Sequence, residues 1–119
     1  MPVTITETSG FSFTEPLDSL PFVPKTDPKR KFEKIASIQI YGLAKRMRNL
    51  EYRKLLIGVS GGLDSALALL VACKAFDTLQ LDRKGIIAVT MPALATSERT
   101  SNNATKLIDA LGVTKKAIN

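Results

Sequence analysis

The 119-residue sequence predicts an α/β fold with a doubly wound parallel sheet. Two short apolar runs, at 55–59 and 85–91, alternate with longer segments of helical periodicity. Strands that alternate with helices favour parallel βαβ units with right-handed crossovers. Residues 115–119 resemble only the approach to a third strand. We therefore expect a doubly wound domain that is truncated after about two strands.

The first 24 residues predict a linker. Residues 1–24 contain Pro, Thr, Ser and Gly and show no sustained helical period, although 3–6 alternate as in a short strand. Asp27 and Pro28 then give the signals of an N-cap and a first helical turn, so a helix is expected over 28–49. Its apolar positions follow helical spacing and are Phe32, Ile35, Ala36, Ile40, Leu43, Met47 and Leu50.

The remaining elements follow in order. The run at 55–59 is apolar on both faces, which predicts a buried strand of the parallel type. Residues 64–76 are apolar almost all round, so this helix should be buried on more than one side. After a connection at 77–84 comes the strand at 85–91. A loop at 92–97 leads to a third helix, which Thr96 or Ser97 could cap and which Gly112 ends. Its apolar face holds Ala104, Leu107, Ile108 and Leu111.

Composition excludes several kinds of chemistry. The chain has no His, one Cys and a formal net charge of +6. Without His it lacks the commonest general base and metal ligand, and one Cys allows no internal disulfide and no cysteine metal site. Cys73 lies in the apolar helix, where a thiol is inert, so we interpret it as core. We expect a cytoplasmic location.

The positive charge is spread along the chain and predicts a solvated surface, with no nucleic acid as a partner. No apolar run approaches the length of a membrane-spanning helix, and residues 1–19 do not have the pattern of a signal peptide. The sequence thus predicts neither a membrane anchor nor a nucleic-acid interface.

One segment carries the functional signal. Residues 55–65 read Leu-Leu-Ile-Gly-Val-Ser-Gly-Gly-Leu-Asp-Ser, a strand followed by a glycine turn and a helix N-terminus. The first backbone N–H groups of a helix have no intrahelical partner, and the helix dipole favours an anion there. Gly61 and Gly62 let a phosphate approach the backbone closely. This arrangement predicts a phosphate-binding loop.

Asp64 makes the prediction more specific. A Walker-type loop would carry a Lys near the phosphates, whereas this loop carries a carboxylate. A carboxylate beside a phosphate is repulsive unless a cation lies between them, and Mg²⁺ is held by one or two carboxylates together with substrate phosphates. We therefore expect Asp64 to be a Mg²⁺ ligand, although an acidic first-turn residue also stabilises a helix.

Ser60-Gly61-Gly62-Leu63-Asp64-Ser65 resembles the pyrophosphate loop of the enzymes that cleave ATP between its α and β phosphates. Flanking segments extend the resemblance, over about 21–113, to the synthetase domain of glutamine-dependent NAD synthetases. They are Pro21-Phe22-Val23-Pro24, Gly42-Leu43-Ala44-Lys45-Arg46, Leu67-Ala68-Leu69-Leu70-Val71-Ala72, Leu81-Asp82-Arg83-Lys84-Gly85-Ile86-Ile87, Thr90-Met91-Pro92 and Arg99-Thr100-Ser101-Asn102-Asn103-Ala104. The stretch Ala93-Leu94-Ala95 differs, since the family pattern has glycines around an aromatic residue there.

The resemblance implies an adenine nucleotide α-hydrolase-like fold, with 25–119 as the first part of the synthetase domain and 1–24 as the link from a glutaminase domain. It implies that the loop binds ATP with Mg²⁺, that the Ser60 and Ser65 hydroxyls contact phosphate, and that adenine rests near Met91. Thr96, Ser97 and Arg99 either border the nucleotide or merely cap the third helix. The implied nucleotide-binding residues are Gly58, Val59, Ser60, Gly61, Gly62, Leu63, Asp64, Ser65 and Met91, with no catalytic side chain assigned.

The resemblance also implies a reaction. Deamido-NAD is adenylated by ATP with release of pyrophosphate, and ammonia, free or from glutamine, then displaces AMP to give NAD. A homo-oligomer is expected at full length, and these 119 residues alone should be inactive. Two alternatives stay open. Other pyrophosphate-loop amidotransferases and thiolating enzymes share the loop, and Gly58-Val59-Ser60-Gly61-Gly62 also fits the G-x-S-x-G elbow of α/β-hydrolases.

Overall fold

The computed structural model describes residues 10, 14, 18–91 and 98–118, and the side chains of 98–101 lie outside this description. The predicted loop at 92–97, with Thr96 and Ser97, and the possible strand at 3–6 also lie outside the described residues. In chain order the elements are α1 (Pro28–Asn49), β1 (Leu55–Gly58), α2 (Leu63–Thr78), the 3₁₀ helix η1 (Arg83–Gly85), β2 (Ile86–Thr90), α3 (Glu98–Leu111) and β3 (Thr114–Ala117).

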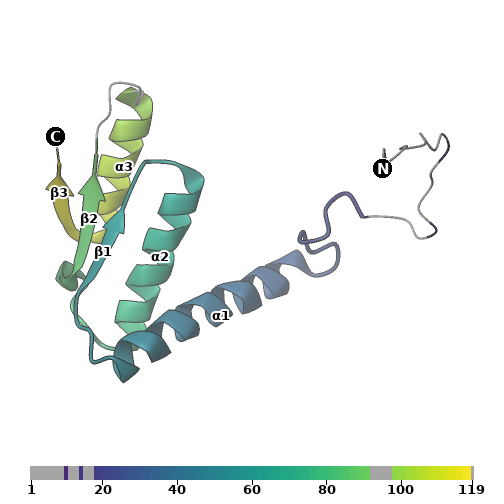
Figure 1. The fold of residues 1–119 in the computed structure, drawn as a ribbon, viewed down its shortest axis with the longest axis horizontal. Coiled ribbons are helices and arrows are strands. Elements are labelled where there is room, and N and C mark those ends of the chain that lie inside the picture. Colours follow the sequence, from purple (N-terminus) through teal and green to yellow (C-terminus); the bar gives the residue numbers. More distant parts are fainter. Residues whose placement is uncertain (1–9, 11–13, 15–17, 92–97, 119) are drawn as a thin grey trace, which may run out of the picture.

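The strands form one parallel sheet in the order β1-β2-β3 (Figure 1). This confirms the predicted parallel α/β class. The expectation of about two strands was wrong, because Thr114–Ala117 forms a third strand in which Thr114 pairs with Ile87 and Ala117 with Thr90. The edge of β2 supplies backbone hydrogen-bond partners, so a short and fully exposed polar segment can adopt strand geometry.

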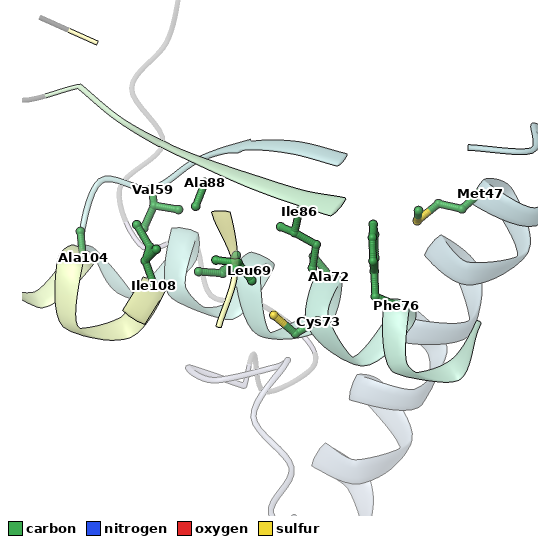
Figure 2. Packing of buried hydrophobic residues seen from close by; sticks show 11 residues of the cluster. Met47, Val59, Leu69, Ala72, Cys73, Phe76, Ile86, Ala88, Ala104 and Ile108 are labelled. Atoms are coloured by element: carbon green, nitrogen blue, oxygen red, sulfur yellow. The ribbon is translucent and has the colours of Figure 1, made fainter. Parts of the chain in front are cut away.

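The core lies between the sheet and two helices. Both α2 and α3 contact β2 and each other, so they lie on the same face of the sheet. Figure 2 shows Leu69, Ala72 and Phe76 of α2 and Ile108 of α3 gathered against Ile86 and Ala88 of β2. Cys73 is buried among them, and burial raises the pKa of its thiol, as expected for an inert core cysteine.

The opposite face of the sheet is exposed, so the predicted burial of the first strand on both faces was wrong. The run at 55–59 should have been buried on both faces, but Leu56 is 69% exposed while Leu55 and Ile57 pack against the core. The reason is topological: two successive right-handed crossovers in the same direction put both helices on one face. The predicted burial of α2 on more than one side holds for its second half, whereas Leu63 and Leu67 in its first half are exposed.

Helix α1 has the predicted bounds. Asp27 is its N-cap, and its side chain accepts a hydrogen bond from the backbone N–H of Arg30. The second half of α1 packs against α2 and buries Ala44 and Met47, while Phe32 and other apolar residues of the first half are exposed as α1 extends away from the sheet (Figure 1). Gly112, with φ of +68°, follows α3 as predicted. Among the described residues no helix is long and apolar enough to cross a membrane.

Arg83 joins three elements at the end of the sheet opposite the glycine turn. Its guanidinium donates two hydrogen bonds to the Asp77 carboxylate, at 2.8 and 2.7 Å, and a third to the Leu111 carbonyl at the end of α3. These hydrogen bonds lower the pKa of Asp77 below its usual range. The ion pair is about one-third exposed, with side-chain exposures of 34% and 39%, so its contribution is limited by solvent screening.

Replacing Asp77 with Asn should therefore cost at most about 1 kcal/mol at neutral pH. Because the folded-state pKa is lowered, the contribution is complete above the unfolded-state pKa and is lost as the pH falls through the folded-state pKa. Unfolding by urea at a series of pH values should show the difference in free energy of unfolding between wild type and Asp77→Asn disappearing as the pH falls through the lowered pKa of Asp77. A stability difference that does not change with pH would contradict this account.

Candidate functional site

The predicted loop lies where the chain passes from β1 into α2, at the carboxyl end of the sheet (Figure 1). The Val59 N–H donates to the Val89 carbonyl at 2.8 Å, which extends the pairing of β1 and β2 by one residue beyond β1. Val59 is buried, and the chain then emerges at Ser60, which is exposed. Ligands of open α/β sheets bind beyond the carboxyl ends of the strands, so the loop has the position expected of a binding site.

Backbone geometry at Gly61 and Gly62 forms the turn. Gly61 has φ of +86°, a conformation that L side chains rarely adopt, which explains glycine there. Gly62 is the N-cap of α2 with extended backbone, and no side chain caps the helix at this residue. The first turn of α2 thus begins directly after the glycine pair.

Two serine hydroxyls close the loop through four hydrogen bonds. The Ser65 hydroxyl donates to the Gly62 carbonyl at 3.0 Å and accepts from the Ser60 N–H at 3.3 Å. The Ser60 and Ser65 Oγ atoms are 3.1 Å apart, and Ser60 Oγ accepts from the Gly62 N–H at 3.3 Å. No pattern in the sequence indicates that the hydroxyls bond each other, since only the folded turn brings residues 60 and 65 together.

The first turn of α2 offers hydrogen-bond donors to solvent. Ala66 N–H makes the first helical bond, to the Gly62 carbonyl. Within the described part of the chain, the N–H groups of Leu63, Asp64 and Ser65 donate no hydrogen bond to any acceptor. Unpartnered N–H groups and the positive end of the helix dipole together favour an anion at this position.

Asp64 is exposed in this first turn, beside the three N–H groups. Among the described residues no cluster of three or more His, Cys, Asp or Glu side chains could hold a metal by itself. A single accessible carboxylate fits Mg²⁺ only where phosphate oxygens or water supply the other ligands, which is the usual coordination of this ion. Asp64 also borders an apolar groove of about 470 Å³ between α1, β1 and α2.

Met91 lies beside the loop. It follows β2 at the same edge of the sheet and is 64% exposed. A Cβ atom placed on Gly58 would lie 3.9 Å from the Met91 methyl group, so the Met91 side chain lies next to the end of β1. The structure therefore brings the segment 58–65 and Met91 together, while their roles as ligands stay predictions. Thr96 and Ser97 lie outside the described residues, as does the Arg99 side chain.

The hydrolase alternative finds no support in this geometry. A nucleophile elbow places its Ser at the sharp, strained point of the strand-to-helix turn. Here the positive φ falls on Gly61, and Ser60 is not among the positive-φ residues. The Ser60 hydroxyl is hydrogen-bonded within the loop, to Ser65 and to the Gly62 N–H.

Comparisons with known proteins give NAD synthases as similar proteins. Residues 35–119 match the family model described as NAD synthase. The chain is 48% identical over 101 residues to the glutamine-dependent NAD(+) synthetase of Mycobacterium leprae, and the match covers 82% of the chain but only 15% of that protein. It therefore spans about 15% of the length of such curated relatives.

Solved structures share the fold. A glutamine-dependent NAD+ synthetase from Acinetobacter baumannii, in complex with ADP, matches with a TM-score of 0.63 and 26% identity, over 70% of this chain and 15% of that one. An NH3-dependent NAD synthetase from Campylobacter jejuni, in complex with nitrate, matches with a TM-score of 0.62 and 23% identity over 73% of this chain and 35% of that chain, and shows the fold alone.

Proposed function

The chain belongs to the NAD synthase family, and we therefore propose that it forms the ATP-binding first part of the synthetase domain of a ligase that amidates deamido-NAD to NAD. The observation that carries the proposal is the turn from β1 into α2. It combines a positive-φ glycine, three N–H groups without a partner among the described residues and one exposed carboxylate at the carboxyl end of the sheet. A similar solved structure was obtained with ADP, which supports a nucleotide as the ligand.

The residues of the loop have separate proposed roles. The N–H groups of Leu63, Asp64 and Ser65 bind phosphate oxygens and orient the pyrophosphate group of ATP. The Asp64 carboxylate holds Mg²⁺, which when bound neutralises phosphate charge and so favours departure of pyrophosphate. Met91 offers an exposed apolar surface for the adenine ring beside the end of β1.

The proposed reaction has two steps. The nicotinate carboxylate of deamido-NAD attacks the α-phosphate of ATP, and the bond to pyrophosphate breaks, which leaves an acyl adenylate. Ammonia then attacks the acyl carbon and AMP departs, which gives the amide of NAD. The contribution of this chain is positioning and electrostatic stabilisation of charge on the phosphates, and no side chain acts as an acid or base.

The ammonia source and the deamido-NAD site are proposed to lie outside these 119 residues. Relatives such as the Mycobacterium leprae protein are several times longer, and they are named for their use of glutamine. We propose a glutaminase domain in the same full-length chain as the source of ammonia, a homo-oligomeric full-length form and a cytoplasmic location. The deamido-NAD site is proposed to lie in the part of the synthetase domain beyond this sequence.

Two protein preparations test the proposal. Full-length protein that carries this sequence should form NAD from ATP, Mg²⁺, deamido-NAD and ammonia, with one AMP and one pyrophosphate released per NAD. The 119-residue chain alone should form none. If the full-length protein released pyrophosphate only with an adenylated substrate other than deamido-NAD, it would be a different pyrophosphate-loop enzyme. NAD formation by the 119-residue chain alone would show that the remaining substrate sites do not lie outside it.

A further inference from the structure

We propose that the loop formed by residues 18–25 is a docking element, which anchors Phe22 in an apolar pocket of the glutaminase domain of the full-length protein. This inference rests on the proposed function, which supplies that domain. The loop lies before the first turn of α1, at the end of the helix that extends away from the sheet (Figure 1). It is therefore separate from the glycine turn between β1 and α2.

Three interactions within the described residues close this loop. The Leu20 N–H donates to Asp18 Oδ1 at 3.0 Å, and the Lys25 ammonium forms an ion pair with Asp18 Oδ2 at 2.7 Å. The Val23 N–H donates to the Leu20 carbonyl at 3.1 Å, which makes a turn with Pro21 at its second position, where proline is favoured. A loop that is already closed loses less conformational freedom on docking than an open one.

The apolar side chains of the loop face solvent. Phe22, at the third position of the turn, is 92% exposed, and Leu20 and Val23 are 57% and 49% exposed. Single exposed apolar residues are ordinary on protein surfaces, but three within four positions of a closed loop form a patch of the kind that marks an interface. A large aromatic residue in such a patch is a common anchor of protein contacts. Phe22 is therefore the residue that we expect to enter the partner's pocket.

The position of the loop in the sequence indicates which partner covers it. The NAD synthase family model begins at residue 35, so the loop precedes the part of the chain that the model matches. The match to the Mycobacterium leprae protein extends over 101 residues, which is longer than 35–119 and must include residues before 35. The match to the NH(3)-dependent NAD(+) synthetase of Helicobacter hepaticus extends over 79 residues, which 35–119 can accommodate. Similarity before residue 35 thus accompanies the use of glutamine in these two relatives, which favours the glutaminase domain as the partner.

Charge around the loop predicts the chemistry of the pocket. Residues 25–34 contain five basic and two acidic side chains, all of them exposed. Lys31 and Lys34 line a groove of about 480 Å³ between the loop and α1, together with Phe22 and Ile35. An apolar pocket with acidic residues around its entrance complements this surface. A second copy, in a two-fold contact through this loop, would bring the same basic side chains to the interface, so like charges disfavour it.

Photo-crosslinking in the full-length protein tests the contact directly and needs no substrate. With p-benzoylphenylalanine in place of Phe22, the cross-linked peptides are identified by mass spectrometry after irradiation, and we expect the main adduct on the glutaminase domain. Tyr52, an aromatic residue that is 60% exposed beyond the other end of α1, is the matched control and should give no adduct on that domain. Main adducts on the synthetase domain of either copy, or no adduct from position 22, would overturn the proposal.

Variants of Phe22 test what the contact does. Phe22→Ser should lower glutamine-driven NAD formation about tenfold, the scale expected for loss of an aromatic anchor, and glutamate should be released in excess over NAD. With ammonia supplied in place of glutamine, the rate should stay at the wild-type level. Phe22→Tyr keeps the ring and should retain most of the glutamine-driven activity. Equal losses with glutamine and with ammonia in Phe22→Ser, or no loss with either, would contradict the docking role.

Removal of the loop closure gives a second test. Asp18→Ala removes both the ion pair with Lys25 and the acceptor of the Leu20 N–H. It should lower glutamine-driven activity less than Phe22→Ser does, and it should add little in a Phe22→Ser background, because the anchor is already absent. Additive losses would show that the closure acts independently of Phe22 and would exclude its role in docking. If the wild-type protein formed no NAD from either nitrogen source, the proposed function would fail, while the cross-links would still decide the contact.

Discussion

We expect Asp64→Asn to lower the affinity of the full-length protein for ATP in the presence of Mg²⁺ by about tenfold or more, which corresponds to about 1.4 kcal/mol. The reason is electrostatic, because the neutral amide would bind less tightly the divalent cation that we propose Asp64 holds beside the ATP phosphates. Without Mg²⁺ the change should have the opposite sign, since the substitution then removes a negative charge beside a phosphate. Calorimetric titration with ATP, with and without Mg²⁺, measures both effects.

The control for this prediction is Asp109→Asn. Asp109 is an exposed carboxylate in the second half of α3, so the substitution changes the net charge equally but far along the chain from the loop. We expect no change in ATP affinity for this variant. Asp64→Asn should cost no more than about 1 kcal/mol of stability through the helix dipole. Equal ATP affinities of Asp64→Asn and wild type in Mg²⁺ would remove the metal role from Asp64.

We expect Gly85→Ala to lower the free energy of unfolding by about 2 to 3 kcal/mol, the cost of overpacking a close contact. A Cβ atom at Gly85 would lie 2.7 Å from the Arg53 carbonyl oxygen and 2.9 Å from Cε1 of Phe76. The carbonyl belongs to the segment that leads into β1, and Phe76 is fully buried at the centre of the core. Neither neighbour can move without disturbing the strand or the core, so the clash cannot be relieved at a small cost in free energy.

Gly42→Ala is the matched control for this variant. Gly42 lies in the interior of α1 and is exposed, and a Cβ atom placed on it would have no neighbouring atom within 4 Å. The same substitution should therefore stabilise the protein by about 1 kcal/mol through helix propensity. Thermal and urea unfolding of the two variants should move in opposite directions. A stability of Gly85→Ala equal to or above wild type would show that β1 and η1 are not packed as closely as the structure describes.

Local signals in the sequence predicted much of the fold. The N-cap at Asp27 and the helical period after it placed α1 at its observed bounds, and Gly112 marked the end of α3. The order of the predicted strands and helices indicated a parallel sheet, because parallel strands need long crossovers. These features depend on residues near one another in the chain, so their physical causes can be found in the sequence.

The position of the candidate site also follows from chain order, since a strand, a glycine pair and a helix start in succession lie at the carboxyl end of a parallel strand.

Only the tertiary fold decides which face of the sheet the helices cover. Leu56 is as apolar as Leu55 and yet exposed, because both crossovers pass over the other face of the sheet. The fold likewise pairs Thr114–Ala117 with β2 and brings the Ser60 and Ser65 hydroxyls together in the loop. Burial, strand pairing and hydrogen-bond partners involve groups that only folding brings together, so they could not be predicted from neighbouring residues.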